Sequence, residues 1–348
     1  AGAGAVLVAA LLGSSLVPLG DPVVPPPVPP GHGSWPTADG GHLAHGVVRA
    51  PEGRPARNPI VVLHGGPGVA DTAGLLETFG PLSQQGYDVW AYDQRGTGRS
   101  SRLTDPAGYT AARDVADLAE VIDQITAERV VLVGHSYGAY LAAAYIAEHP
   151  GRVERAVFLS PGDLDPGRRA GDVQERLTPG QRWAMYRLLL GPRALLAYGL
   201  VQVNPAAAHA FLGDREADAR QDRVYAQSVP GLHCPGRTGP ALHGLGFYAN
   251  VVPGSRRTAA PDLTTRLGQP PVPVLVVKGQ CDYLDWESGT GYLTAFPDST
   301  LLYLRGAGHD VHVDEPGKVR AALADFLAGR PVPGAMGDPL REPSDYQP

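Results

Sequence analysis

The chain has 348 residues, of which 43% are hydrophobic and 18% charged, and its formal net charge at pH 7 is -6. A chain of this length and composition folds around a substantial core, while its 45 glycines and 35 prolines predict many loops. Because the net charge is negative, the chain lacks the cations needed to neutralise many phosphates, which argues against a nucleic-acid partner.

The first 20 residues, AGAGAVLVAALLGSSLVPLG, carry no charged side chain and precede a proline-rich run. An uncharged apolar run of this length is typical of an export signal or a membrane anchor. We expect residues 1–20 to be an anchor or an uncleaved signal, with a cleaved signal or a buried helix as the alternatives. Residues 21–36 then form a semi-rigid linker. This interpretation places the protein at a membrane, associated through its N-terminus, or outside the cell, rather than in the cytoplasm.

Strand-like and helix-like segments alternate over residues 37–160, the first part of the predicted core. Five apolar or alternating runs predict strands, at 42–50, 59–66, 87–93, 129–136 and 155–162. The helical spacing of apolar residues predicts helices between them, at 73–85, 111–127 and 138–149. Such alternation is typical of an α/β fold, in which a mostly parallel sheet carries helices on both faces.

The alternation stops over residues 161–270, where apolar residues recur at helical spacing. We expect this stretch to be a helical cap inserted into the α/β core. Alternation resumes over residues 271–330, with strands at 271–282 and 299–306 and helices at 288–296 and 315–327. We expect the proline- and glycine-rich tail, residues 331–348, to lie along the surface or to be disordered.

The chain has two cysteines, Cys234 and Cys281, which are too few for a disulfide framework or a four-thiolate zinc site. A single disulfide between them and a pair of buried free thiols are both consistent with the sequence. No GxGxxG motif follows the early strands, which argues against a dinucleotide-dependent oxidoreductase. The sequence predicts neither a cofactor nor a metal centre.

Residues 134–138 read Gly-His-Ser-Tyr-Gly, a G-x-S-x-G motif between a predicted strand and a predicted helix. In this position a tight turn lifts the serine hydroxyl above the edge of the sheet, and the flanking glycines avoid clashes with the adjoining strand and helix. The N-terminus of the following helix favours negative charge at the same place. We therefore predict that Ser136 is a nucleophile.

A serine hydroxyl needs a general base, and the base needs an acid that orients it. Asp282 lies at the end of the strand at 271–282, and His309 lies in the loop after the strand at 299–306. Both positions are at the carboxyl edge of a parallel sheet, where Ser136 also lies, so the three side chains are expected to converge. We predict His309 as the base and Asp282 as the acid. The rivals are Asp285 and Asp310 for the acid and His312 for the base.

Residues 64–68, His-Gly-Gly-Pro-Gly, directly follow a predicted strand. A glycine-rich turn lets backbone N–H groups approach a substrate closely, and an oxyanion needs such donors in place before the reaction begins. We assign the two oxyanion donors to the N–H groups of Gly66 and of Tyr137, the residue after the nucleophile.

Together these motifs resemble the prolyl-aminopeptidase branch of the α/β-hydrolases. The likeness rests on three motifs, HGGPG at 64–68, DQRGTGRS at 93–100 and GHSYGA at 134–139, with Asp282 and His309 later in the chain. The resemblance implies an eight-stranded core with a helical cap, and cleavage of an N-terminal residue, commonly proline, from peptides.

The resemblance also implies roles for individual residues. It makes Ser136, Asp282 and His309 the catalytic triad. It further implies that Asp93 and Arg95 brace the loop near the oxyanion hole, for which a plain surface ion pair is the alternative.

The sequence departs from that branch at the nucleophile, because its members typically have tryptophan after the serine in a GGSWG-like elbow. Here His135 precedes Ser136 and Tyr137 follows it. Exopeptidases of this kind also place an acid in the cap for the free amine of the substrate. Glu216 and Asp218 are the candidates for that substrate-binding role, and charges on a solvated helix face, interleaved with arginines, are the alternative.

We expect a serine hydrolase that cleaves a peptide or amide bond in a small substrate, aminopeptidase-like, through an acyl-serine intermediate. An esterase or lactonase that acts on a small ester is the alternative. In another class of function, the chain is a membrane-tethered binding protein that keeps the hydrolase fold without turnover. The intact set of Ser136, Asp282 and His309 argues against that third interpretation.

Overall fold

The computed structural model describes residues 13–255, 260–268 and 270–348, which surround an eight-stranded sheet with the order β1-β2-β4-β3-β5-β6-β7-β8. β2 pairs antiparallel with β1 and β4, and the pairs from β4–β3 to β7–β8 are parallel. The strands are β1 (Gly33–Pro36), β2 (His42–Val48), β3 (Ile60–Leu63), β4 (Val89–Tyr92), β5 (Val130–His135), β6 (Val153–Leu159), β7 (Val274–Cys281) and β8 (Ser299–Gly308).

Helices cover both faces of this sheet. The core helices are α2 (Thr72–Phe79), α3 (Ala111–Gln124), α4 (Tyr137–Glu148), α10 (Glu287–Ala295), α11 (Val311–Asp314) and α12 (Pro316–Leu327). Alternate residues of β3 point to opposite faces: Val61 and Leu63 pack with α3 and α4, and Ile60 and Val62 pack with α2. Because both faces are buried, β3 is apolar throughout and its neighbour β5 begins with four apolar residues, as the sequence indicated.

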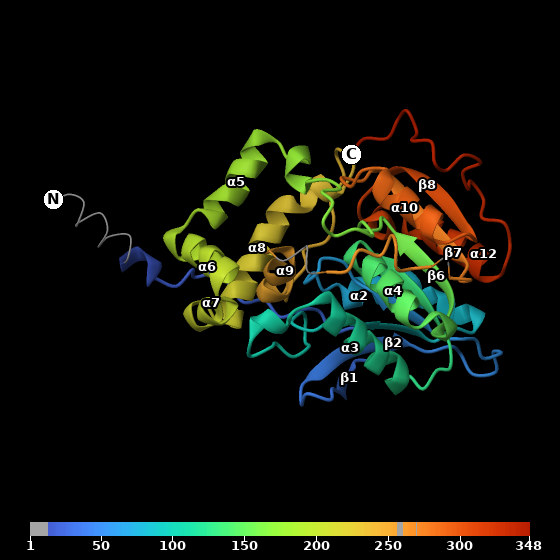
Figure 1. Cartoon of the computed structure of the whole chain (residues 1–348), viewed down its shortest axis with the longest axis horizontal. Helices are drawn as coiled ribbons and strands as arrows, with labels where there is room; N and C mark the ends of the chain where they lie inside the picture. Colours follow the sequence, from blue (N-terminus) through green and yellow to red (C-terminus); the bar gives the residue numbers. More distant parts are fainter. Residues whose placement is uncertain (1–12, 256–259, 269) are drawn as a thin grey trace.

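The cap is a group of helices inserted between β6 and β7. It contains α5 (Pro179–Leu189), α6 (Pro192–Val203), α7 (Pro205–Phe211), α8 (Asp214–Leu232) and α9 (Phe247–Ser255). Figure 1 shows these helices gathered on one side of the molecule, beside the sheet. The predicted fold class, a mostly parallel sheet with helices on both faces and an inserted helical cap, is confirmed.

The segment before the first predicted strand lies against both parts of the fold. Asp21 forms ion pairs of 2.8 and 2.6 Å with Arg220 and Arg223 of α8, and the carbonyl of Pro30 accepts from Val47 N at 2.9 Å. Within the expected linker, Gly33–Pro36 forms β1, a strand that the sequence did not predict because GSWP shows no clear alternation.

Residues 1–12, the first part of the expected anchor, lie outside the described residues. Among the helices in residues 13–255, 260–268 and 270–348, none has both the length and the apolar character needed to cross a membrane.

The tail follows the surface of β7 and β8. Met336 N donates to the carbonyl of Leu301 at 2.9 Å, and Gln347 N donates to the carbonyl of Gln280 at 2.8 Å. Tyr346 is buried, and its hydroxyl donates to the backbone carbonyl of Asp282 at 3.2 Å. The end of the chain therefore packs behind the loop that carries the predicted triad acid.

Candidate active site

Ser136 occupies the sharp turn between β5 and α4, with φ = 52° and ψ = -116°. A non-glycine residue at positive φ is strained and needs support from its surroundings. That support includes a hydrogen bond of 3.0 Å from Ser136 N to the carbonyl of Leu159 in β6. The flanking glycines are required by packing: a Cβ at Gly134 would lie 2.3 Å from the carbonyl oxygen of Gly138, and one at Gly138 would lie 2.4 Å from that of Leu63.

His309 and Asp282 form the hydrogen-bonded pair that the chain order predicted. His309 Nδ1 lies 2.7 Å from Asp282 Oδ1, and Asp282 is fully buried. The rival Asp285 is instead held by the Arg168 guanidinium at 2.6 and 2.8 Å. Since Nδ1 is bonded to the carboxylate, Nε2 is the His309 nitrogen that remains for proton transfer.

Lys278 is a residue at this site that sequence reasoning missed. Its Nζ lies 2.7 Å from Asp282 Oδ2, 3.1 Å from the carbonyl of Leu284 and 2.9 Å from Ser288 Oγ. Burial alone would raise the pKa of Asp282, but the charge of Lys278, followed by that of His309, holds it well below its usual range. Burial in turn lowers the pKa of Lys278. A lysine within the apolar run VLVVKGQC, four residues before the predicted acid, was the available signal.

The glycine-rich loop lies directly against the nucleophile. A Cβ at Gly65 would lie 3.1 Å from Ser136 Cβ, and Gly66 adopts a φ of 119°. The cap holds the far side of the loop, since Asn250 Nδ2 donates to the carbonyl of Pro67 at 2.6 Å. Tyr137, the other predicted oxyanion donor, is the first residue of α4, where backbone N–H groups have no partner within the helix.

Gln94, which the sequence analysis did not single out, holds His64 at the start of this loop. Gln94 N donates to His64 Nε2 at 3.0 Å, and the Gln94 side-chain amide donates to the His64 carbonyl at 2.8 Å. Asp93, which was expected to brace the loop, accepts from Thr72 Oγ1 at 2.5 Å. It therefore ties the end of β4 to the start of α2.

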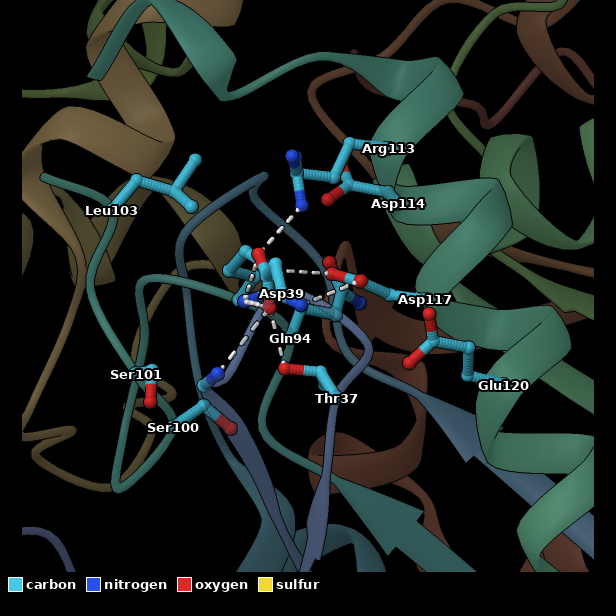
Figure 2. A network of polar contacts seen from close by, with 12 residues as sticks. Thr37, Asp39, Gln94, Ser100, Ser101, Leu103, Arg113, Asp114, Asp117 and Glu120 are labelled. Carbon is cyan, nitrogen blue, oxygen red and sulfur yellow. Dashed lines mark hydrogen bonds and ion pairs between the residues drawn. The ribbon is translucent and has the colours of Figure 1, made fainter. Parts of the chain in front are cut away.

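Arg95 lies in a separate ion-pair network, and not against Asp93. Its guanidinium donates to both carboxylate oxygens of Asp117 in α3, at 2.8 Å each, and lies 3.2 Å from Asp39. Figure 2 shows Asp39 beside Asp117 and between Thr37 and Arg113. Arg95 is 3% exposed, so the alternative of a surface ion pair is also wrong. The network joins the turn between β1 and β2, the segment after β4 and α3.

Ser136 and His309 open onto one cavity of about 400 Å³ between the core and the cap. This volume is typical of a site for a small molecule. Its lining includes Gly66, Ser136 and His309 from the core, and residues of α8 and α9 from the cap. The geometry therefore brings a strained serine, a carboxylate-bound histidine and a glycine loop to one cavity.

The sequence matches the family model described as alpha/beta hydrolase fold over residues 58–316. The chain belongs to the α/β-hydrolase family. The relatives of this chain that are named below are hydrolytic enzymes, so the prediction that the chain is a hydrolase is confirmed.

Two curated relatives and one solved structure illustrate the range of proteins to which the chain is similar. A putative carbamate hydrolase, RutD, from Variovorax paradoxus is 31% identical over 283 residues, or 80% of this chain and 96% of that protein. A probable proline iminopeptidase from Streptomyces coelicolor is 32% identical over 200 residues, or 56% of this chain and 52% of that protein. The crystal structure of a proline iminopeptidase from Mycobacterium smegmatis has a TM-score of 0.57 and 21% identity, covering 86% of this chain and 98% of that one.

The two cap acids that were expected to bind substrate lie elsewhere in the hydrolase. Glu216 is paired with Arg193 at 2.8 Å, and Asp218 with Arg102 at 2.9 Å. Neither residue lines the cavity in the part of the chain that the structure describes. Both belong to α8, but their arginine partners come from other segments, which helical charge spacing could not reveal.

The end of α8 is attached to both loops of the triad. Cys234 and Cys281 form a disulfide, which resolves the alternative that the sequence left open, and Cys281 directly precedes Asp282. His309 N donates to the carbonyl of Leu232 at 2.7 Å, and His233 Nδ1 lies 3.0 Å from Asp314 Oδ1.

One group of side chains in the cavity has the spacing of metal ligands. His135, His309 and Asp310 each offer an atom within 4.8 Å of the others. Because His309 is the predicted base, an ion bound there would compete with proton transfer.

Proposed function

We infer that the chain is a serine hydrolase that cleaves an amide or peptide bond in a small substrate through an acyl-Ser136 intermediate. The observation that carries this proposal is the strained conformation of Ser136 at a cavity that also contains a histidine bonded to a buried carboxylate. A strained hydroxyl at a helix N-terminus, with a base that opens onto the same cavity, is the arrangement that nucleophilic catalysis requires.

The reaction proceeds in two halves. In the first, His309 Nε2 accepts the proton of the Ser136 hydroxyl while Oγ forms a bond to the substrate carbonyl carbon. The N–H groups of Gly66 and Tyr137 stabilise the resulting oxyanion. The C–N bond of the substrate then breaks, and the leaving nitrogen takes the proton from His309 and departs as an amine. In the second half, His309 deprotonates a water molecule that attacks the acyl carbon, and Ser136 recovers its proton as the acid product leaves.

The preference for an amide over an ester rests on the motifs and on the named relatives. HGGPG and DQRGTGRS together resemble the prolyl-aminopeptidase branch. The curated relatives described above are named as a putative carbamate hydrolase and a probable proline iminopeptidase. One observation favours an ester substrate instead: Glu216 and Asp218, the acids expected to bind the free amine of a peptide, are occupied by arginines.

The nucleophile is tested by labelling with a fluorophosphonate probe. We expect the wild type and Ser228→Ala to be labelled and Ser136→Ala to remain unlabelled, with turnover reduced by roughly 10⁴-fold or more in Ser136→Ala. Ser228 is a suitable control because it is a second serine that lines the cavity. Labelling of Ser136→Ala at the wild-type rate would refute the assignment.

The bond type is tested by comparing kcat/KM for proline β-naphthylamide and 4-nitrophenyl butyrate. Amide turnover that depends on Ser136 supports the proposal. Ester turnover without measurable amide turnover would refute the amide proposal and favour an ester substrate.

A further inference from the structure

The wall of the catalytic cavity contains two carboxyl groups. Asp71 and Asp310 both line the cavity, whereas none of the described lining residues is Arg or Lys. The remaining titratable groups of the wall are tyrosines and histidines. The cavity therefore offers carboxylates without a fixed cation of its own.

Asp71 comes from the core, at the N-cap of α2, three residues after the glycine-rich loop. One of its oxygens accepts from Gly74 N at 3.2 Å. No ion pair to Asp71 is present within residues 13–255, 260–268 and 270–348, so its charge is not compensated by an arginine or a lysine. Burial, and then the negative charge of Asp310, raises its pKa to about 7.

Asp310 follows His309 and is only 9% exposed. Its oxygens lie 3.4 Å from His135 Nε2 and 3.7 Å from His233 Nε2, and its side chain makes no hydrogen bond in the described part of the chain. Burial lowers the pKa of His135 well below its usual value, so this histidine adds no positive charge beside Asp310. Burial raises the pKa of Asp310 itself. His233 is bonded to Asp314 at 3.0 Å, and despite burial this hydrogen bond and then the charge of Asp310 raise the pKa of His233, so that its imidazole compensates Asp310 in part.

Aromatic rings complete the same part of the cavity. Tyr225 of α8 lines it, and after burial the charges of Asp310 and Asp71 are the largest causes that raise the Tyr225 pKa, which indicates that all three groups surround one space. The ring of Tyr283 also lines the cavity and lies 4.6 Å from the ring of His309. Carboxylates together with tyrosine faces are the groups that bind organic cations in proteins.

We propose that Asp71, Asp310 and Tyr225 form a subsite that binds a positively charged group of the substrate, an amine or a quaternary ammonium. The subsite belongs to the cavity of the proposed hydrolase and rests on that function, but it defines the charge class of the substrate whichever bond is cleaved. Two carboxylates that line one cavity repel each other, and a bound cation removes this repulsion. An anionic substrate would meet the same carboxylates and is excluded.

The test compares esters that differ only in replacing a quaternary nitrogen by carbon. Choline butyrate and 3,3-dimethylbutyl butyrate carry the difference on the alcohol side. The 4-nitrophenyl esters of 4-(trimethylammonio)butanoate and 5,5-dimethylhexanoate carry it on the acyl side. All assays contain EDTA, so that a trace metal ion does not occupy Asp310.

We expect kcat/KM of the cationic ester to exceed that of its carbon analogue by tenfold or more in at least one pair. Asp71→Asn and Asp310→Asn should each reduce this ratio by at least threefold. The ratio is the readout because it cancels any general loss of activity in a variant. Glu216→Gln removes the same charge outside the cavity and should leave the ratio unchanged.

A ratio at or below one in both pairs would overturn the subsite, as would a ratio that persists in both aspartate variants. Failure of the proposed function gives a different result, namely no fluorophosphonate labelling of Ser136 and no turnover of any ester. In that case calorimetric binding of choline and of 3,3-dimethylbutan-1-ol to the wild type tests the subsite directly. Equal affinity for the two would again overturn it.

Discussion

Replacement of Lys278 by methionine removes the one ammonium group that lies against the proposed triad acid. In the wild type, Asp282 divides its two oxygens between Lys278 and His309, at 2.7 Å each. Both Lys278 and Asp282 are fully buried. The variant leaves the carboxylate in the same apolar surroundings with His309 as its remaining ionisable partner.

The size of the effect follows from the geometry. Two hydrogen bonds and the width of a carboxylate separate the ammonium and the imidazole by roughly 6 Å, so their repulsion is about 3 kcal/mol at an effective dielectric constant of about 20. The ammonium group therefore disfavours a second positive charge in the site, and its removal should shift the acid limit of activity by about 1 to 2 pH units. Removing one partner of a buried ion pair also lowers the free energy of unfolding, by about 3 kcal/mol.

The assay is the pH dependence of kcat/KM for a neutral ester. In Lys278→Met the acidic limb should move to higher pH by about 1 to 2 units. Ser288→Ala serves as the control, because it removes a neutral hydrogen-bond acceptor from Lys278 and leaves every charge in place. An acidic limb that stays in place in Lys278→Met, in protein still labelled by fluorophosphonate, would refute the reasoning.

Three further predictions concern stability. Replacing both Cys234 and Cys281 by serine should lower the free energy of unfolding by about 3 to 4 kcal/mol, because the disulfide closes a loop with a sequence separation of 47 residues. Denaturant unfolding measures this loss, and chemical reduction of the wild type should cause an equal one. Burial raises the pKa of Asp114 to about 7, so the folded protein holds a proton there that the unfolded chain loses near pH 4. As the pH rises from about 4 to about 7, the wild type should therefore lose stability relative to Asp114→Asn. Parallel profiles of stability against pH for the two proteins would contradict this. Gly138→Ala, whose Cβ would meet backbone at 2.4 Å, should lower the melting temperature, whereas Gly291→Ala in α10, with open space around it, should leave it unchanged or raise it.

The fold and the candidate triad could be predicted because they follow from rules of chain order. Parallel strands end at one edge of a sheet, so residues after β5, β7 and β8 meet there whatever their sequence separation. That rule brought Ser136, Asp282 and His309 together. The rule did not separate His309 from its rival His312. The glycines at 306 and 308 favoured His309, and in the structure His309 bonds to Asp282, whereas His312 lies in α11 and its Nδ1 makes no hydrogen bond in the described residues.

The remaining parts of the site depend on contacts that no local pattern encodes. Lys278 lies in an apolar strand, and its partner can be identified only once the position of Asp282 is known. The spacing of charges on α8 shows that Glu216 and Asp218 belong to a polar face, but not which segment covers it. Asp218 meets Arg102 across 116 residues of sequence. Asp71 and Asp310 line one cavity although they precede two different core helices, α2 and α11.

The attachment of α8 limits how the cap moves. Its C-terminal end is joined covalently to the residue before Asp282 and by a backbone hydrogen bond to His309 itself. An opening motion that kept these bonds would have to pivot near that end of α8. A motion that broke the hydrogen bond between His309 N and Leu232 would remove one constraint on the loop that carries the imidazole, so cap opening of that kind would also loosen the catalytic base.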